Sequence, residues 1–297
     1  MQFSVIIPTH NRATLLRKAL DSVFAQTFMD YEVIVVDDGS TDETVQMMAG
    51  YNRKVRFLQQ QNQGAGAARN TGAKAAIGDY LAFLDSDDVW FPWTLATYAQ
   101  VIRQNANPSF VTGLPLVFTA DEQLKQATGG SCSVEMFPDY YASSDAWRWF
   151  SASSFVIRKE RFAAEGGFHG GWGAEDADLT MMLGTANGFV HFTAPHTFGY
   201  RDQLKSLKTM PTYALSGSRL MLAKEKNGLY PGGNARARAR REILARQIRP
   251  VVFDCLKAGL LAEAWELYRA TFRWNVALGR WKYLAAFPVK ALLGRNK

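Results

Sequence analysis

Tyr80-Leu81-Ala82-Phe83-Leu84, followed at once by Asp85-Ser86-Asp87-Asp88, is the stretch that decides the fold. Five consecutive apolar or aromatic residues bounded by polar ones are typical of a strand buried on both faces of a parallel sheet. Three carboxylates then stand at the carboxyl end of this strand, the edge where open α/β sheets bind ligands. Acids this close repel one another unless a cation or hydrogen-bond donors hold them. A divalent metal carrying phosphates is one suitable partner, and a solvated acidic turn is the alternative.

The composition is that of an ordinary globular protein, with 297 residues of which 47% are hydrophobic and 21% are charged. Cys132 and Cys255 stand far apart and match no metal-ligand spacing, so we expect neither a disulfide framework nor a zinc site. The N-terminus has no basic segment before an apolar stretch, and no apolar run is long enough to span a bilayer. We therefore expect no secretory signal and a cytoplasmic location.

The charge is distributed unevenly along the chain. Residues 1–200 hold 14 Lys and Arg against 21 Asp and Glu, a net charge of −7. Residues 201–297 hold 20 Lys and Arg against 6 Asp and Glu, a net charge of +14, and the two parts sum to the +7 of the chain. This asymmetry predicts an acidic site in the first part and an anionic partner for the last third.

Strands and helices alternate before the central stretch. Apolar and β-branched runs at 3–8, 31–36 and 55–58 predict three strands, and apolar positions at helical spacing from Ala13 predict a helix after the first strand. This alternation predicts an α/β fold, in which helices cover both faces of a parallel sheet.

Gly64-x-Gly66 stands after a predicted strand and before a predicted helix, so it imitates a dinucleotide-binding fingerprint. Two details count against a nicotinamide cofactor. Arg69 occupies the position of the third glycine, where the fingerprint requires close packing of helix on strand, and the polar run 59–63 separates the strand from the glycines. We therefore do not expect a nicotinamide cofactor.

Five stretches in a fixed order resemble the family 2 glycosyltransferases of the GT-A fold. They are VIIPTHNRATLLRKALDSVFAQT (5–27), EVIVVDDGSTDET (32–44), NQGAGAARNTG (62–72), GDYLAFLDSDD (78–88) and GGFHGGWGAEDADLTMML (166–183). The resemblance covers most of residues 1–185. It implies a mostly parallel, Rossmann-like sheet flanked by helices, in a catalytic domain over residues 1–215. The composition beyond it predicts a basic, aromatic-rich helical extension over residues 216–297.

The resemblance also implies a nucleoside-diphosphate sugar, UDP-linked, as the donor and a divalent metal, Mn²⁺ or Mg²⁺, as the cofactor. The residues expected to hold them are Pro8, Thr9, Asn11, Arg12, Asp38, Arg69, Asp85, Ser86 and Asp87. In this pattern the backbone around Pro8 and Thr9, with Asn11 and Arg12, borders the base and the ribose. Asp38 accepts a hydrogen bond from the base, Asp85 contacts the ribose and Asp87 binds the metal. Arg69 donates to the phosphates, with an ordinary surface arginine as the alternative.

Asp176 is implied by the resemblance as the base of a single-displacement, inverting transfer, and Glu175 as a contact to the acceptor or the sugar. Both acids precede the apolar run 179–183, so they stand at a predicted helix N-terminus, where the helix dipole favours carboxylates. Capping of that helix is the alternative role for both.

The last protein ligand of the metal stays open. Many members of the family carry a histidine after a Tyr-Arg pair, but here Tyr200-Arg201 is followed by Asp202 and Gln203. The ligand expected in addition to Asp87 is therefore His196 or Gln203.

The C-terminal third is predicted to form basic helices. An arginine-rich helix opens near 234–241 and runs toward Pro250, and apolar residues between 256 and 272 keep helical spacing. The segment 274–297 mixes aromatic residues with Lys and Arg, as interfacial helices on anionic bilayers do. A solvated basic face is the alternative.

Together these features predict an inverting, metal-dependent glycosyltransferase of the hexosyltransferase type. We expect it to act on a glycan or a lipid-linked acceptor at the inner face of the cytoplasmic membrane, as part of cell-envelope polysaccharide synthesis. The alternative is a catalytically inactive protein of the same fold that binds membrane or nucleic acid. The presence of Asp38, Asp87 and Asp176 speaks against inactivity, and the acidic first part opposes nucleic-acid binding.

Overall fold

The computed structural model describes residues 1–51, 54–144, 151–169, 173–202 and 211–293. The chain divides into two compact units that alternate along the sequence. The first unit comprises Met1–Asp139, Arg148–His169 and Ala186–Gln203, and the second comprises Tyr140–Trp147, Gly170–Thr185 and Leu204–Lys297. The sequence predicted a catalytic domain that ends at residue 215. That limit concerns function, which the division into compact units does not test, so it stays a prediction.

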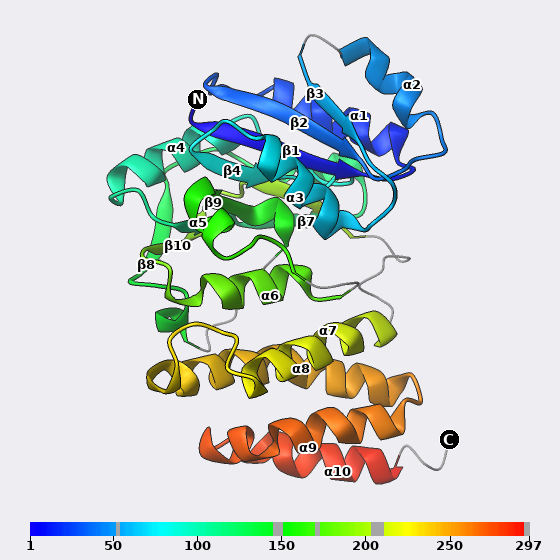
Figure 1. The fold of residues 1–297 in the computed structure, drawn as a ribbon, viewed down its shortest axis with the longest axis vertical. Coiled ribbons are helices and arrows are strands. Elements are labelled where there is room, and N and C mark those ends of the chain that lie inside the picture. Colours follow the sequence, from blue (N-terminus) through cyan, green and yellow to red (C-terminus); the bar gives the residue numbers. More distant parts are fainter. Residues whose placement is uncertain (52–53, 145–150, 170–172, 203–210, 294–297) are drawn as a thin grey trace. The chain divides into compact units, whose positions relative to one another are not determined.

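An eight-stranded sheet organises the first unit (Figure 1). In spatial order its strands are β3 (Arg56–Gln59), β2 (Tyr31–Asp37), β1 (Phe3–Thr9), β4 (Tyr80–Phe83), β9 (Phe155–Arg158), β6 (Phe110–Thr112), β10 (Phe189–Ala194) and β8 (Ser133–Phe137). The four strands β3, β2, β1 and β4 run parallel, as predicted. Beyond them β9 and β8 run antiparallel to their neighbours, so the rest of the sheet is mixed.

The first unit also contains a smaller sheet and most of the short helices. The small sheet consists of β5 (Val89–Trp90), β11 (Phe198–Arg201) and β7 (Pro115–Phe118). The helices are α1 (Ala13–Phe24), α2 (Thr44–Met48), α3 (Ala65–Ala75), α4 (Thr94–Gln104) and α5 (Lys159–Ala164), with 3-10 turns η1 (Ala49–Tyr51), η2 (Asp121–Gln126) and η4 (Ala152–Ser154). This mixture confirms the predicted α/β class.

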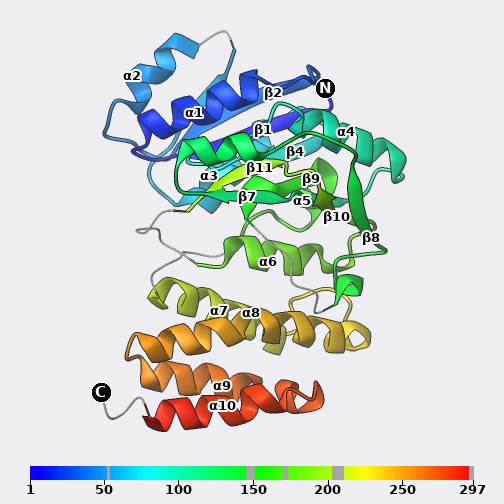
Figure 2. The ribbon, with the colours of Figure 1, turned by 180° about the vertical axis from the view of Figure 1, so that it is seen from behind.

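Helices cover both faces of the large sheet. The side chains at odd positions of β1 pack with α1 and α4 in one buried cluster, on the side that faces the viewer in Figure 2. Ile6 points to the other face, where a Cβ on Gly72 of α3 would come 2.6 Å from Ile6 Cγ2. Gly72 therefore permits the close approach of helix and strand. Arg69 stands where the dinucleotide fingerprint has its third glycine. α3 still packs closely on β1, because Gly72, three residues further along, provides the space.

The second unit is helical within its described residues. Its elements are η3 (Tyr141–Ser143), α6 (Glu175–Met182), η5 (Leu183–Thr185), α7 (Pro211–Lys226), η7 (Asn234–Arg236), α8 (Ala237–Lys257), α9 (Leu261–Ala277) and α10 (Trp281–Leu293). The last four α-helices lie side by side, with α8 against α7 and α9, and α10 against α9 (Figure 1). These helices confirm the predicted helical C-terminal extension.

One boundary in the second unit differs from the prediction. The sequence suggested that the arginine-rich helix runs only toward Pro250, but α8 passes through Pro250 and ends at Lys257. Proline removes one backbone hydrogen bond from a helix, and packing can outweigh that loss. Here Val252 and Cys255, both beyond the proline, are fully buried. None of the helices in the described ranges combines the length and the apolar composition needed to cross a membrane.

Candidate functional site

The candidate site lies at the carboxyl ends of β1, β2 and β4. Thr9 pairs with Asp37 across β1 and β2, and Ile6 pairs with Phe83 across β1 and β4. The three strands are parallel, so the loops that follow them leave the same edge of the sheet. Open α/β sheets bind ligands at such an edge. These loops contain six of the nine residues predicted to hold the donor, while Pro8 and Thr9 end β1 and Arg69 lies in α3.

Asp38 holds the loop that leads from β3 to α3. Its Oδ1 accepts hydrogen bonds from the Gln63 backbone N–H at 3.0 Å and from the Gln60 side chain at 2.8 Å. Its Oδ2 accepts from the Gly64 backbone N–H at 2.8 Å. Asp38 is 4% exposed, and a carboxylate offers about four acceptor positions. Three of these are used within the protein, which leaves room for one bond to a ligand.

Asn11 joins the loop after β1 to the loop after β2. Its backbone adopts the left-handed region with φ 51°. Its Oδ1 accepts from the Thr41 N–H at 2.7 Å and the Asp42 N–H at 3.2 Å, and its own N–H donates to the Ser40 hydroxyl at 2.8 Å. A cavity of about 250 Å³ opens beside this junction and is lined by residues 11–15, 42 and 43. The structure therefore places Asn11 as a bridge between loops, at the rim of a cavity.

Arg12 reaches from the same loop to the acidic stretch after β4. Its Nη1 lies 2.7 Å from Asp87 Oδ2. The Arg12 side chain is 40% exposed and that of Asp87 is 19% exposed, so the pair stands at the surface of the unit. Burial raises the pKa of Asp87, and the Arg12 guanidinium opposes this rise. The structure thus brings together a predicted nucleoside contact and the predicted metal ligand.

Arg69 forms the second ion pair of the site. Its Nη2 lies 2.5 Å from Asp85 Oδ1, and its guanidinium lies over the Phe168 ring at 5.1 Å from the centroid. The Arg69 side chain is only 7% exposed. This burial contradicts the alternative of an ordinary surface arginine. The first part of α3 therefore directs a cation at the end of β4.

Asp88 differs from its two acidic neighbours because it is buried. Its Oδ2 accepts from the Ser153 hydroxyl at 2.6 Å, and its Oδ1 accepts from the Arg201 backbone N–H at 2.9 Å. Burial, followed by the nearby Asp87 and Asp85 carboxylates, raises the pKa of Asp88 well above its ordinary value. Ser153 also accepts a bond from the Asp85 N–H at 2.9 Å. Asp88 thus anchors the acidic turn, and Ser153, which is not among the predicted site residues, is part of that anchor.

The remaining predicted donor residues of the first unit are buried at the same edge. Pro8 pairs with Val36 in the sheet, and Thr9 and Ser86 are each 3% exposed. The Thr9 hydroxyl has no hydrogen-bond partner among the described residues. An unsatisfied buried hydroxyl is costly, so this one is a group that a bound ligand or water could satisfy.

The acidic turn is chemically suited to a hard divalent cation. Across the described ranges, no three His, Cys, Asp or Glu side chains converge as a complete ligand set. Mg²⁺ and Mn²⁺ bound together with phosphates need only one or two protein carboxylates, because phosphate oxygens and water fill the other positions. Asp85 and Asp87 fit this requirement, since both are carboxylates that remain partly exposed.

His196 does not fit a metal site at Asp87. It precedes β11, whose other end carries Arg201 with its Nε 3.2 Å from the Asp87 carbonyl oxygen. His196 comes five residues before Arg201, and five residues of extended chain span about 16 Å, so His196 lies far from Asp87. The His196 Nδ1 also lies 2.9 Å from the Pro115 carbonyl oxygen. This placement argues against the expected ligand role of His196, while Gln203 lies outside the described residues.

Glu175 and Asp176 form the start of α6 in the second unit. Both are half-buried, and the cap position before them is held by Ala174, in the left-handed region with φ 57° and without a side-chain cap. Neither acid is therefore the N-cap residue, although both stand in the first turn. Because they belong to the second unit, their role toward a donor held by the first unit stays a prediction.

Asp178 fixes α6 within the second unit. It is fully buried, its Oδ2 accepts from the Lys224 Nζ at 2.6 Å and its Oδ1 accepts from the Tyr230 hydroxyl at 2.8 Å. Burial and the Asp178 charge raise the pKa of Tyr230, so its phenol stays protonated and donates. The Tyr141 hydroxyl adds a bond to the Met181 carbonyl at 2.7 Å. This anchor was not predicted, although an acid among the apolar residues of α6 was an available signal.

Comparisons with known proteins agree with the geometry. A family model described as "Glycosyl transferase family 2" matches residues 4–162. An uncharacterized glycosyltransferase of Nostoc sp. is 35% identical over 166 residues, which cover 54% of this chain and 52% of that protein. The glycosyltransferase GlyA of Streptococcus pneumoniae is 38% identical over 104 residues, which cover 34% of this chain and 14% of that protein. The chain thus spans about half, or less, of the length of these curated relatives.

Solved structures share the fold. TarS 1-349 of S. aureus in complex with UDP-GlcNAc matches with a TM-score of 0.71 at 22% identity, over 93% of this chain and 83% of that chain. The mannosyltransferase PcManGT of Pyrobaculum calidifontis, in complex with GDP-Man and Mn²⁺, matches with a TM-score of 0.54 at 20% identity, over 98% of this chain and 87% of that chain. At these identities the likeness shows the fold alone, and it confirms the predicted GT-A fold.

Proposed function

We propose that this chain, which belongs to glycosyl transferase family 2, moves a sugar from a UDP-linked donor to a hydroxyl group of a glycan or a lipid-linked acceptor. Members of this family are enzymes that transfer sugars from nucleotide donors. The observation that carries this proposal is the presence of two ion pairs at the edge of the sheet. They join Arg12 to Asp87, and Arg69 to Asp85.

These two pairs would serve a diphosphate and a metal. Phosphate oxygens are good partners for guanidinium groups, so a bound diphosphate offers each arginine a replacement for its carboxylate. Asp87 would then hold Mn²⁺ or Mg²⁺, and Asp85 beside it would contact the ribose. When bound, the metal supplies Lewis-acid stabilisation of the charge on the departing diphosphate. Support for UDP comes from the UDP-GlcNAc bound to TarS, although GDP-Man bound to PcManGT is a reminder that the fold accepts a second base.

We propose Asp176 as the general base. It takes the proton of the acceptor hydroxyl while the hydroxyl oxygen attacks the anomeric carbon of the donor sugar. The bond between that carbon and the diphosphate oxygen breaks, UDP leaves, and the single displacement inverts the anomeric centre. Glu175, next in the same helical turn, would contact the acceptor or the sugar. The N-terminus of α6 favours the ionised form of both carboxylates.

We place this activity at the inner face of the cytoplasmic membrane, on a lipid-linked or membrane-proximal glycan of the cell envelope. The support is the charge of the chain, since residues 201–297 carry a net +14 while residues 1–200 carry −7. A basic terminal segment favours an anionic lipid surface. Nucleic acid is not an expected partner, because the acidic first part would repel it.

Thermal unfolding with nucleotides tests the donor site. UDP with Mn²⁺, at about 100 times its Kd, stabilises by about 2.7 kcal/mol and raises Tm by about 4 °C for a chain of 297 residues. We expect this shift to need Mn²⁺ and to disappear in Asp87→Ala. Asp21→Ala, which removes an exposed carboxylate of α1, is the matched control and should keep the shift. A shift that survives in Asp87→Ala would overturn the assignment of the metal ligand.

The anomer released on slow hydrolysis of a UDP-α-sugar tests the mechanism. In an inverting reaction, NMR detects the β sugar first, before mutarotation. Removal of a general base slows such reactions by about 10²- to 10⁴-fold, so we expect a loss of that size in Asp176→Asn. Initial release of the α sugar would refute inversion, and full activity of Asp176→Asn would refute the choice of base.

A further inference from the structure

The last described helix, α10, packs into the second unit through one face only. The buried residues of that face are Tyr283, Leu284, Phe287 and Ala291. Phe287 stacks on Tyr268 of α9 with ring centroids 4.5 Å apart, and the Tyr268 hydroxyl donates to the Leu284 carbonyl at 2.9 Å. α10 is thus firmly held on this side.

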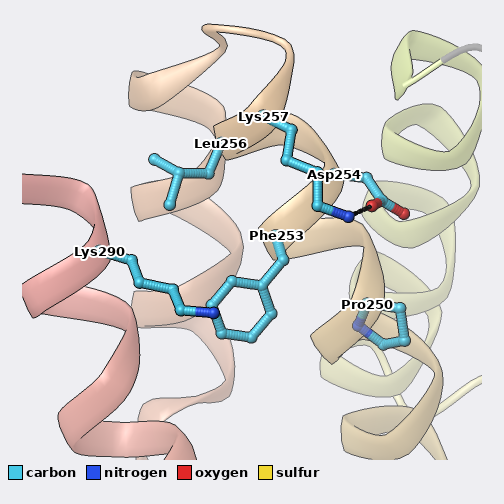
Figure 3. A pocket seen from close by; sticks show the side chains of 6 residues that line it. All are labelled: Pro250, Phe253, Asp254, Leu256, Lys257 and Lys290. Atoms are coloured by element: carbon cyan, nitrogen blue, oxygen red, sulfur yellow. Dashed lines mark hydrogen bonds and ion pairs between the residues drawn. The ribbon is translucent and has the colours of Figure 1, made fainter. Parts of the chain in front are cut away.

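A flank of α10 borders a cavity of about 420 Å³ (Figure 3). The cavity is lined by Pro250, Phe253, Asp254, Leu256, Lys257 and Lys290. Lys290 of α10 lies over the Phe253 ring, with its Nζ 5.0 Å from the centroid, and Lys257 pairs with Asp254 at 3.0 Å. Both cations of the cavity therefore have partners within the unit.

The opposite face of α10 is apolar and exposed. Trp281 is 63% exposed, Val289 is 55% exposed and Leu292 is 61% exposed. With the exposed Ala285, these residues follow the spacing i, i+4, i+8 and i+11, which places them in one line along the helix. We call these four residues the outer stripe. Single exposed apolar residues are ordinary, but a surface helix normally presents polar residues along this whole side.

The sequence around the outer stripe is purely basic. After Glu266 the chain contains no Asp or Glu. The seven charged residues that follow are Arg269, Arg273, Arg280, Lys282, Lys290, Arg295 and Lys297. Lys282 is exposed and follows Trp281 directly. The described part of this segment therefore combines an exposed apolar line with positive charge.

We propose that the outer stripe of α10 inserts into the interface of an anionic lipid bilayer, an inference that rests on the proposed membrane location. An apolar helical face buried at the level of the headgroups, flanked by Lys and Arg that meet anionic lipids, is how interfacial helices bind membranes. A second copy of this chain is the competing occupant. Two copies would bring together C-terminal segments that each carry +14, and like charges oppose such an interface.

Vesicle flotation of the full chain tests the inference. The probes are phosphatidylcholine vesicles with ~30% phosphatidylglycerol and vesicles of phosphatidylcholine alone. The test variant Trp281→Glu/Leu292→Glu changes the outer stripe. The matched control Met29→Glu/Met136→Glu adds the same charge to the first unit, at apolar residues that are 78% and 61% exposed. A second test variant, Val289→Glu, covers the case in which the double variant does not fold.

We expect the parent and the control to float with anionic vesicles and to stay unbound with neutral ones. The stripe variants should lose about tenfold or more in partition coefficient. Equal flotation of parent and stripe variants would overturn the inference. A second pattern would also overturn it: the parent does not bind vesicles, light scattering shows it to be a dimer, and the stripe variants are monomers. In that case α10 would join two copies of the chain.

The UDP shift with Mn²⁺, measured on the same preparations, separates the two proposals. A normal shift without vesicle binding overturns the docking inference and leaves the glycosyltransferase proposal intact. Vesicle binding that depends on the stripe, without a shift by any nucleotide, supports the docking surface and overturns the proposed donor site.

Discussion

Replacement of Asp178 by Asn tests whether a buried ion pair fixes the helix that carries the proposed base. Asp178 is fully buried and accepts bonds from Lys224 at 2.6 Å and Tyr230 at 2.8 Å. Asn has nearly the same shape, and its carbonyl still accepts from Tyr230. It carries no charge, however, so the Lys224 ammonium, on a side chain that is 13% exposed, loses this anionic partner.

The expected size of the effect follows from the burial. Removal of one partner of a buried ion pair costs about 3–5 kcal/mol, and the surviving bond to Tyr230 places our expectation near 3 kcal/mol. With an unfolding entropy of about 2.1 cal/mol/K per residue, this lowers Tm by about 5 °C for 297 residues. The pair Arg219–Glu266 is similarly short at 2.5 Å, but its side chains are 49% and 48% exposed. Its loss in Glu266→Gln should cost about 0–1 kcal/mol and lower Tm by less than about 2 °C.

The assay is thermal unfolding of the parent, Asp178→Asn and Glu266→Gln under identical conditions, followed by donor hydrolysis kinetics. We expect Asp178→Asn to lower kcat while the KM for the donor stays near that of the parent, because the change displaces α6 and leaves the sheet edge of the first unit intact. Equal shifts of Tm in the two variants would show that burial of the Asp178 pair adds nothing. The claim that this pair holds α6 in place would then be refuted.

Three further predictions concern the first unit. Gly72→Ala should lower the free energy of unfolding by about 1–3 kcal/mol, because the new Cβ would lie 2.6 Å from the Ile6 side chain of β1. The control Gly50→Ala, whose Cβ would have nothing within 4 Å, should leave the urea midpoint unchanged. Arg69→Lys keeps the charge but loses the planar fork, so calorimetry should show UDP binding about tenfold weaker, and unchanged affinity would contradict a phosphate role. Hydrogen bonds from Lys18 and Arg201 lower the pKa of Asp121 below its ordinary value of 3.8. The stabilisation that the Asp121 carboxylate contributes is therefore present above that pH, and it is lost as the pH falls through the folded pKa. Asp121→Asn should therefore cost less than about 1 kcal/mol at neutral pH, and a deficit that persists below pH ~3 would contradict this origin.

The first half of the large sheet could be predicted because β1 and β2 are apolar strands of seven residues, β4 is wholly apolar, and helical patterns separate the strands. Such strands, buried on both faces, leave a clear signal in sequence. The other half could not be predicted in the same way. β6 spans only Phe110–Thr112, and β9 is inserted between β4 and β6 although it comes later in the chain. Strand order of this kind is set by tertiary packing, which no local pattern records.

The candidate site was predictable as a set of residues but not as a set of contacts. The sequence marked Arg12, Arg69, Asp85 and Asp87 as donor residues, and the structure joins them in two pairs. Which arginine meets which carboxylate depends on the paths of two loops, and residue spacing does not determine those paths. Ser153 was missed for the same reason, because it reaches the acidic turn from a separate part of the chain.

The three acids of the turn after β4 look equivalent in the sequence, and their partners in the structure distinguish them. Asp88 is 1% exposed and uses both oxygens to hold Ser153 and the Arg201 backbone. Those bonds are part of the fold, and they keep both Asp88 oxygens directed at Ser153 and at the Arg201 backbone. Asp85 and Asp87 instead face arginine side chains, and a guanidinium can exchange a carboxylate for a phosphate while the backbone stays in place. The chemistry open to an acid is therefore decided by whether its present partner can leave. On that criterion we propose Asp87 for the metal and the arginines Arg12 and Arg69 for the diphosphate, in a frame held by Asp88 and Asp38.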